Sequence, residues 1–70
     1  MEREPVQSSA FRSVGYDPTT QTLELEFRDG RLYQFFGVPE EVYREFREAP
    51  SLGGYFQRRI RMGYPFSKVA

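Results

Sequence analysis

Residues 22–36, Thr-Leu-Glu-Leu-Glu-Phe-Arg-Asp-Gly-Arg-Leu-Tyr-Gln-Phe-Phe, decide the fold of this chain. Over residues 22–28 apolar and polar side chains alternate strictly, which is the pattern of a β-strand with one face in a core. Asp29-Gly30 follows, a dipeptide typical of tight turns between antiparallel strands. We therefore expect a β-hairpin whose second strand spans residues 31–37.

The hairpin has two registers, and they place the rings of Tyr33 and Phe35 on opposite faces of the sheet. A two-residue loop turns both rings outward. A three-residue loop, with Gly30 in the left-handed region, pairs Phe27 with Arg31 and turns both rings toward the apolar face. A slip of a single residue moves every side chain of the strand to the other face.

We favour the three-residue loop because it keeps the amide of Gln34 out of the core and sets it beside Glu24 on the outer face. Two apolar residues, Leu32 and Phe36, then also point outward. They need cover from another part of the chain or from a partner.

The flanking segments complete an α+β domain. Residues 1–7 are expected to be a loose polar arm, and residues 8–70 a single domain. Pro39 and Pro50 bound a first helix, and Ser51 is a good N-cap for a second one. The predicted fold is a three-stranded antiparallel meander (about 9–16, 22–28 and 31–37) covered on one face by two C-terminal helices (about 39–49 and 51–62).

The second helix is expected to carry an apolar arc. At about 100° per residue, the arc contains Leu52, Tyr55, Phe56, Ile60 and Met62. Arg59 falls inside this arc, where we expect its methylenes to lie on the core. Arg58 and Arg61 fall on the open side.

Composition excludes several classes of function. The chain has 70 residues, no Cys, no His and no Trp. It therefore has no disulfide, no thiol nucleophile, no imidazole base and no Cys or His ligand for zinc. No apolar run approaches the roughly 18 residues of a membrane helix. We expect a non-catalytic cytoplasmic domain with no cofactor, no metal site and no membrane partner.

Charge is unevenly distributed along this neutral chain. Residues 1–50 contain six basic and ten acidic side chains, whereas residues 51–70 contain four basic ones and no acid. A basic C-terminal third is typical of a surface that meets phosphate. For a nucleic acid, the candidate residues are Arg58, Arg61 and Lys68 for phosphate contacts and Tyr64 and Tyr55 for base stacking.

The second hypothesis is a protein-interaction or self-association domain. It uses Leu32 and Phe36 on the open face of the sheet to bind a protein partner or a second copy of the chain. Overall neutrality favours this hypothesis, and the basic C-terminal third favours nucleic acid.

Several short motifs together resemble the KTSC domain family. They are Gly15-Tyr16-Asp17, residues 23–27, Gly30, Gly37-Val38-Pro39, residues 51–56, Ile60-Arg61 and Tyr64-Pro65. The family's central Tyr-x-Tyr stands here as Tyr33-Gln34-Phe35, so the second hydroxyl is absent. The resemblance implies a small domain of bacterial or phage type that also occurs at the C-terminus of some lysyl-tRNA synthetases. It suggests RNA binding by that association and transfers no site residues.

Overall fold

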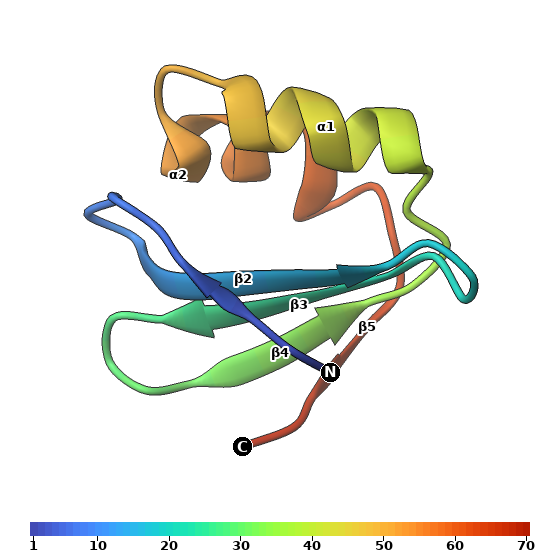
Figure 1. The fold of residues 1–70 in the computed structure, drawn as a ribbon, viewed down its shortest axis with the longest axis horizontal. Coiled ribbons are helices and arrows are strands. Elements are labelled where there is room, and N and C mark those ends of the chain that lie inside the picture. Colours follow the sequence, from blue (N-terminus) through green and yellow to red (C-terminus); the bar gives the residue numbers. More distant parts are fainter.

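The computed structural model describes residues 1–70 and has two layers, a β-sheet and helices that cover one of its faces (Figure 1). Each strand is antiparallel to its neighbours, in the order β1-β2-β3-β4-β5. The strands are β1 (Glu4–Pro5), β2 (Phe11–Asp17), β3 (Thr22–Phe27), β4 (Leu32–Phe35) and β5 (Phe66–Lys68). The helical segments are α1 (Glu40–Glu48), α2 (Leu52–Tyr55) and the π-helical η1 (Phe56–Ile60).

The α+β class and the meander are confirmed, but the sheet has five strands where we expected three. The first seven residues, expected as a loose arm, contain β1, which pairs with β2. The C-terminal segment adds β5 beside β4. Both extra strands are two or three residues long. They are held by backbone hydrogen bonds to their neighbours. A strand this short shows no alternation of apolar and polar side chains, so the sequence does not predict it.

The hairpin has the favoured register. Phe27 N donates to Arg31 O at 2.9 Å, and Gly30 takes a φ of +95° in the three-residue loop. Leu25 lies opposite Tyr33, and Leu23 lies opposite Phe35. Both rings therefore face the helices, and stacking of bases on the outer sheet face by Tyr33 and Phe35 is excluded.

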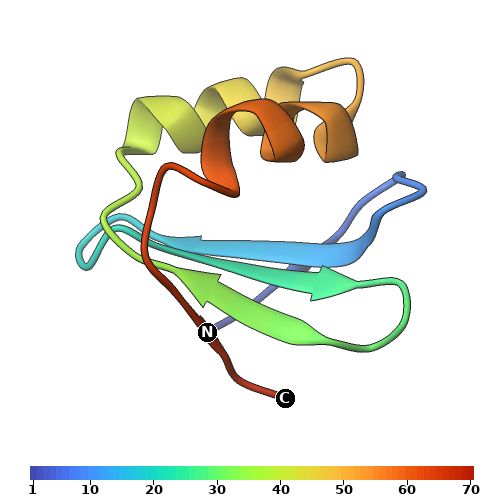
Figure 2. The same ribbon diagram turned by 180° about the vertical axis from the view of Figure 1, so that it is seen from behind.

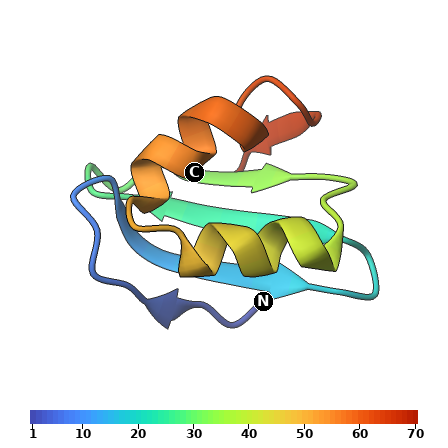
Figure 3. The same cartoon turned by 90° about the horizontal axis from the view of Figure 1, so that it is seen from above.

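Aromatic rings from both layers form the centre of the core. Phe11 of β2 is fully buried, and its ring centroid lies 5.8 Å from that of Phe46 in α1 and 5.5 Å from that of Phe56 in η1. Phe27 of β3 completes the cluster at 5.0 Å from Phe11. Each large ring removes roughly 150–250 Å² from water, which suits a domain of this size. Viewed from above, α1 runs along β2, while α2 and η1 lie toward β4 and β5 (Figure 3).

The second helix begins as predicted, and then it departs from the expected geometry. Gly54 N donates to the Ser51 side chain at 3.1 Å, which confirms the N-cap. From Phe56 the segment is π-helical, and Arg61 N donates to Phe56 O five residues earlier. A π-helix has more residues per turn than an α-helix, so the predicted arc no longer holds. Arg59 is exposed, and Met62 is 88% exposed, so placing these two side chains on the core was wrong.

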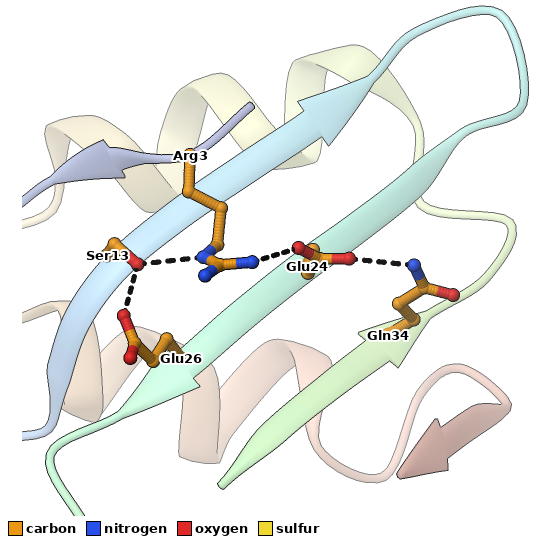
Figure 4. Close-up of polar contacts among 5 residues, drawn as sticks. All are labelled: Arg3, Ser13, Glu24, Glu26 and Gln34. Atoms are coloured by element: carbon orange, nitrogen blue, oxygen red, sulfur yellow. Dashed lines mark hydrogen bonds and ion pairs between the residues drawn. The ribbon is translucent and has the colours of Figure 1, made fainter. Parts of the chain in front are cut away.

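The outer face of the sheet carries a polar network that ties down the N-terminal segment (Figure 4). The Arg3 guanidinium donates to Ser13 Oγ and to the carboxylate of Glu24, which is only 5% exposed. Gln34 Nε2 donates to the other oxygen of Glu24 at 2.8 Å, and Ser13 Oγ donates to Glu26 at 2.7 Å. The buried carboxylate is therefore satisfied on both oxygens.

Gly15 permits this close approach of the N-terminal segment. A Cβ atom at Gly15 would lie 2.5 Å from the carbonyl oxygen of Glu2, which is closer than real Cβ contacts. The longest helix, α1, has nine residues, and none of the helical segments meets the length and hydropathy that a bilayer span requires.

Candidate nucleic-acid interface

An open groove of about 440 Å³ lies between η1 and the side of the sheet formed by β4 and β5. Figure 2 shows η1 above that side of the sheet and the chain descending from it into β5. The groove is lined by residues from β3, β4, β5, the hairpin loop and the end of the second helix. They are Phe27, Arg31, Tyr33, Phe35, Phe56, Gln57, Arg61, Met62 and Phe66.

Aromatic rings make up much of the groove surface. Phe35 and Phe56 are almost completely buried, whereas Tyr33 is half-buried and Phe66 is 58% exposed. The centroid of the Phe66 ring lies 5.8 Å from that of Tyr33 and 5.6 Å from that of Phe35. Phe66 thus packs beside two rings of the neighbouring strand while much of its own surface remains in water. An exposed, supported ring of this kind offers a flat apolar surface to a ligand.

The charged side chains that line the groove are both arginines. Arg61 is exposed, and its Nη1 donates to Gln57 Oε1 at 3.1 Å. Arg31 lies over the ring of Phe27, 5.1 Å from the ring centroid, and its Nε donates to Asp29 at 2.7 Å. Hydrogen bonds from the Arg31 backbone and side chain hold the pKa of Asp29 below its usual value, so this carboxylate offsets part of the Arg31 charge.

Lys68 brings a further cation close to the groove. It lies directly opposite Tyr33 in the β4–β5 pairing, and directly opposite residues point to the same face of a sheet. Lys68 is exposed and has no carboxylate partner. Arg58 is exposed on η1 as expected, but it is not part of the groove lining.

The two predicted stacking residues are less accessible than the hypothesis requires. Tyr55 is only 7% exposed, and its hydroxyl donates to Glu45 at 2.8 Å. Burial, followed by the contact with Glu45, raises the pKa of Tyr55. Its ring is not available for stacking, so we do not include Tyr55 in the candidate site. Tyr64 is half-buried and packs against the core.

The residues of the protein-interaction hypothesis do not form an exposed patch. Leu32 and Phe36 are half-buried, and the C-terminal segment runs beside them. Leu32 N donates to Ala70 O, and Phe36 N donates to Pro65 O, both at 2.9 Å. The C-terminal segment that forms β5 thus runs beside Leu32 and Phe36, the two residues that the sequence analysis expected to need cover.

Of the nine groove residues, only Arg61 was among the predicted site residues. The exposed residues that the sequence analysis missed are Phe66, Met62, Gln57 and Arg31. The alternation of Phe66, Ser67 and Lys68 is a strand signal, but three residues are too few to distinguish a strand from a tail. Met62 was assigned to the core on the assumption of a regular α-helix. In the structure it lies in the turn that follows Ile60 and is exposed at the rim of the groove.

These features define a small α+β domain with an aromatic groove flanked by arginines. The family model of the KTSC domain matches residues 7–64. The chain therefore belongs to the KTSC domain family, as the sequence motifs predicted.

Relatives and a solved structure agree with this assignment. An uncharacterised protein of Stutzerimonas stutzeri is 50% identical over 58 residues, which span 83% of this chain and 82% of that protein. A lysine–tRNA ligase of a Nostoc species is 39% identical over 64 residues, which span 91% of this chain and 11% of the ligase. The crystal structure of a KTSC domain protein from Yersinia pestis matches with a TM-score of 0.95 at 39% identity, covering 99% of this chain and 97% of that one.

Proposed function

We propose that the protein is a small non-catalytic module that binds RNA through the groove between η1 and the β4–β5 side of the sheet. The observation that carries the proposal is the lining of the groove, which combines the exposed ring of Phe66 and the half-buried ring of Tyr33 with two arginines and contains no carboxylate. Proteins that bind single-stranded nucleic acid combine the same two elements, cations for the backbone and rings for the bases.

The separation of charge along the chain supports the proposal. All four basic residues after position 50 are free of acidic neighbours in sequence, and Arg61 and Lys68 are exposed beside the groove. Arginine suits phosphate because its planar guanidinium makes two parallel hydrogen bonds to phosphate oxygens. A neutral protein with two unpaired cations beside one groove can therefore still attract a polyanion.

The relatives add a second line of support. Part of the lysine–tRNA ligase of the Nostoc species resembles almost this whole chain, and that enzyme is named for acting on a tRNA. The shared part is 11% of the ligase, so it does not transfer the ligase activity. If the domain binds RNA, its occurrence within an enzyme that acts on a tRNA has a simple explanation.

The non-catalytic part of the proposal follows from the side chains of the groove. Its lining has no carboxylate, imidazole or thiol to act as a general base or a nucleophile. Its other polar side chains are the phenol of Tyr33, the amide of Gln57 and the two guanidinium groups. The groove is suited to binding a ligand rather than to transforming one.

Titration of a short labelled oligouridine, followed by fluorescence anisotropy at two salt concentrations, tests the proposal. With about three phosphate contacts at a slope of about −0.7 each, a threefold rise in salt weakens binding about tenfold. Arg61→Glu is expected to remove most of the binding. Arg44→Glu on the exposed side of α1 makes the same charge change away from the groove and is expected to leave binding nearly unchanged. No binding of the oligouridine, or equal losses in the two variants, contradicts the proposal.

A protein partner or a second copy of the chain is the second candidate, favoured by the exposure of Met62 and Phe66 beside each other in the groove lining. Light scattering over a range of protein concentrations tests self-association. A mass that doubles with concentration in the wild type and not in Met62→Ser would support it. A constant monomer mass would contradict it.

A further inference from the structure

We infer that the groove seats one unpaired base, so that the module selects single strands over duplexes. This inference rests on the proposed RNA binding and names the part of the RNA that the groove takes. It depends on the position of Phe66, which is exposed but stands inside the groove and not on an open face.

The groove has the size and shape of a small-ligand site. Its volume of about 440 Å³ lies within the roughly 300–1,000 Å³ of sites that hold small molecules. Rings of the sheet form one side, and Gln57, Arg61 and Met62 of the second helix form the other. A base that enters between them meets the ring of Phe66 and the flexible side chain of Met62. A duplex is too wide for this space, and only an extruded nucleotide reaches it.

The groove also has groups for the edge of a base and for its phosphate. Gln57 Oε1 accepts from Arg61, which leaves the Gln57 amide nitrogen as a free donor for a carbonyl oxygen of the base. Arg61 and Lys68 remain available for the phosphates on either side. Paired bases in a duplex already use these carbonyl oxygens, and their faces are covered by neighbouring bases. Extruding one of them costs free energy that a single strand does not pay.

Charge decides between a nucleotide and an apolar peptide as the occupant. The two arginines of the lining and the adjacent Lys68 leave the groove with a cationic rim. A flat ring bearing a negative charge on a short linker matches this arrangement, and a nucleotide has that chemistry. An apolar peptide would leave Arg61 and Lys68 without a charged partner, whereas Arg31 already has Asp29.

The experiment compares two probes, a labelled oligouridine and the same strand annealed to its complement, with four proteins. The wild type is expected to prefer the single strand by about tenfold, the scale of one stacked base. Phe66→Leu keeps an apolar side chain against Tyr33 and Phe35 but removes the π-face, and it is expected to lose this preference while still binding the duplex. Phe66→Tyr keeps the ring and is expected to retain the preference.

Val69→Ser is the matched control. Val69 is 51% exposed, close to the 58% of Phe66, and belongs to the same C-terminal segment, but it does not line the groove. It is expected to behave as the wild type. Thermal unfolding of each variant checks that the domain keeps its stability.

The outcomes separate this inference from the proposed function. If the wild type binds both probes equally, or if Phe66→Leu behaves as the wild type, the base-seating inference is overturned. Salt-dependent binding that Arg61→Glu abolishes would leave the proposed function standing in that case. If the wild type binds neither probe, both are overturned. Competition of the oligouridine by an acidic peptide with one aromatic residue, at equal affinity, also overturns the inference.

Discussion

Replacing Arg3 by Met is the sharpest test of how the N-terminal segment contributes to stability. Arg3 bridges β1 to the buried carboxylate of Glu24 and to Ser13, across the outer face of the sheet (Figure 4). Methionine keeps most of the side-chain volume and removes the guanidinium. Glu24 then keeps one hydrogen-bond donor, Gln34, for a carboxylate that is 5% exposed.

The magnitude follows from the burial of the two partners. A hydrogen bond to a charged group contributes about 1.5–3 kcal/mol. The Arg3 side chain is 29% exposed, so water reaches part of the vacated space, and we expect the lower half of that range. A loss of about 2 kcal/mol lowers the Tm of a domain this small by about 8–16 °C.

Glu4→Gln is the control because it breaks an ion pair in the same segment. Glu4 binds Arg47 at 2.7 Å, but its side chain is 72% exposed. Exposed pairs contribute about 0–1 kcal/mol, so this substitution is expected to change stability by about 0.5 kcal/mol or less. Urea unfolding with an unchanged slope measures both variants.

The effect of Arg3→Met depends on pH. Burial acts to raise the pKa of Glu24, but the hydrogen bonds from Gln34 and Arg3 and the charge of Arg3 outweigh it, so the pKa of Glu24 is lowered. A lowered pKa in the folded protein adds stability above the unfolded value of about 4.3, and this stability is lost as the pH falls through the folded value. The difference between wild type and Arg3→Met is therefore largest at neutral pH and closes in acid. If Arg3→Met costs no more than Glu4→Gln, or if its cost is the same at pH 3 and pH 7, the reasoning about Glu24 is wrong.

Three further predictions concern single positions. Gly15→Ala forces a Cβ within 2.5 Å of Glu2 O, so we expect the N-terminal segment to detach, seen as faster hydrogen exchange of its amides while the core amides stay protected. Gly30→Ala, at a φ of +95°, is expected to cost about 1–2 kcal/mol in urea unfolding; an unchanged midpoint would contradict the loop geometry. Tyr55→Phe removes a hydrogen bond to the exposed Glu45, and we expect a loss of about 1 kcal/mol or less; a larger loss would mean that Glu45 is less accessible than the structure indicates.

The hairpin could be predicted because its two strands carry a redundant signal. Alternation over residues 22–28 fixes which side chains share a face, and the chemistry of Gln34 and Gly30 selects the register. The same reasoning fails for β1 and β5, because two or three residues carry no period. These strands form only where the rest of the sheet supplies unpaired backbone groups, and that information is not local to them.

The groove was missed for a related reason. Its walls come from residues separated by up to 39 positions, from Phe27 to Phe66, and no short motif joins them. Arg61 could be selected because charge segregates along the sequence. Phe66 could not, since its place in the groove depends on contacts with Tyr33 and Phe35 across the β4–β5 pairing.

The π-helical segment accounts for the one basic residue of the second helix, Arg59, that lies on the surface against expectation. In a regular α-helix that buries Phe56 and Ile60, Arg59 falls on the same arc and would be drawn toward the apolar core. The bond from Arg61 N to Phe56 O adds a residue to the turn, so Phe56 and Ile60 remain buried while Arg59 becomes exposed. Arg61, which falls on the open side of a regular helix as well, and Met62, in the turn that follows Ile60, line the groove. The apolar face of the second helix thus packs while Arg59 stays in water, because one turn of the helix is not α-helical.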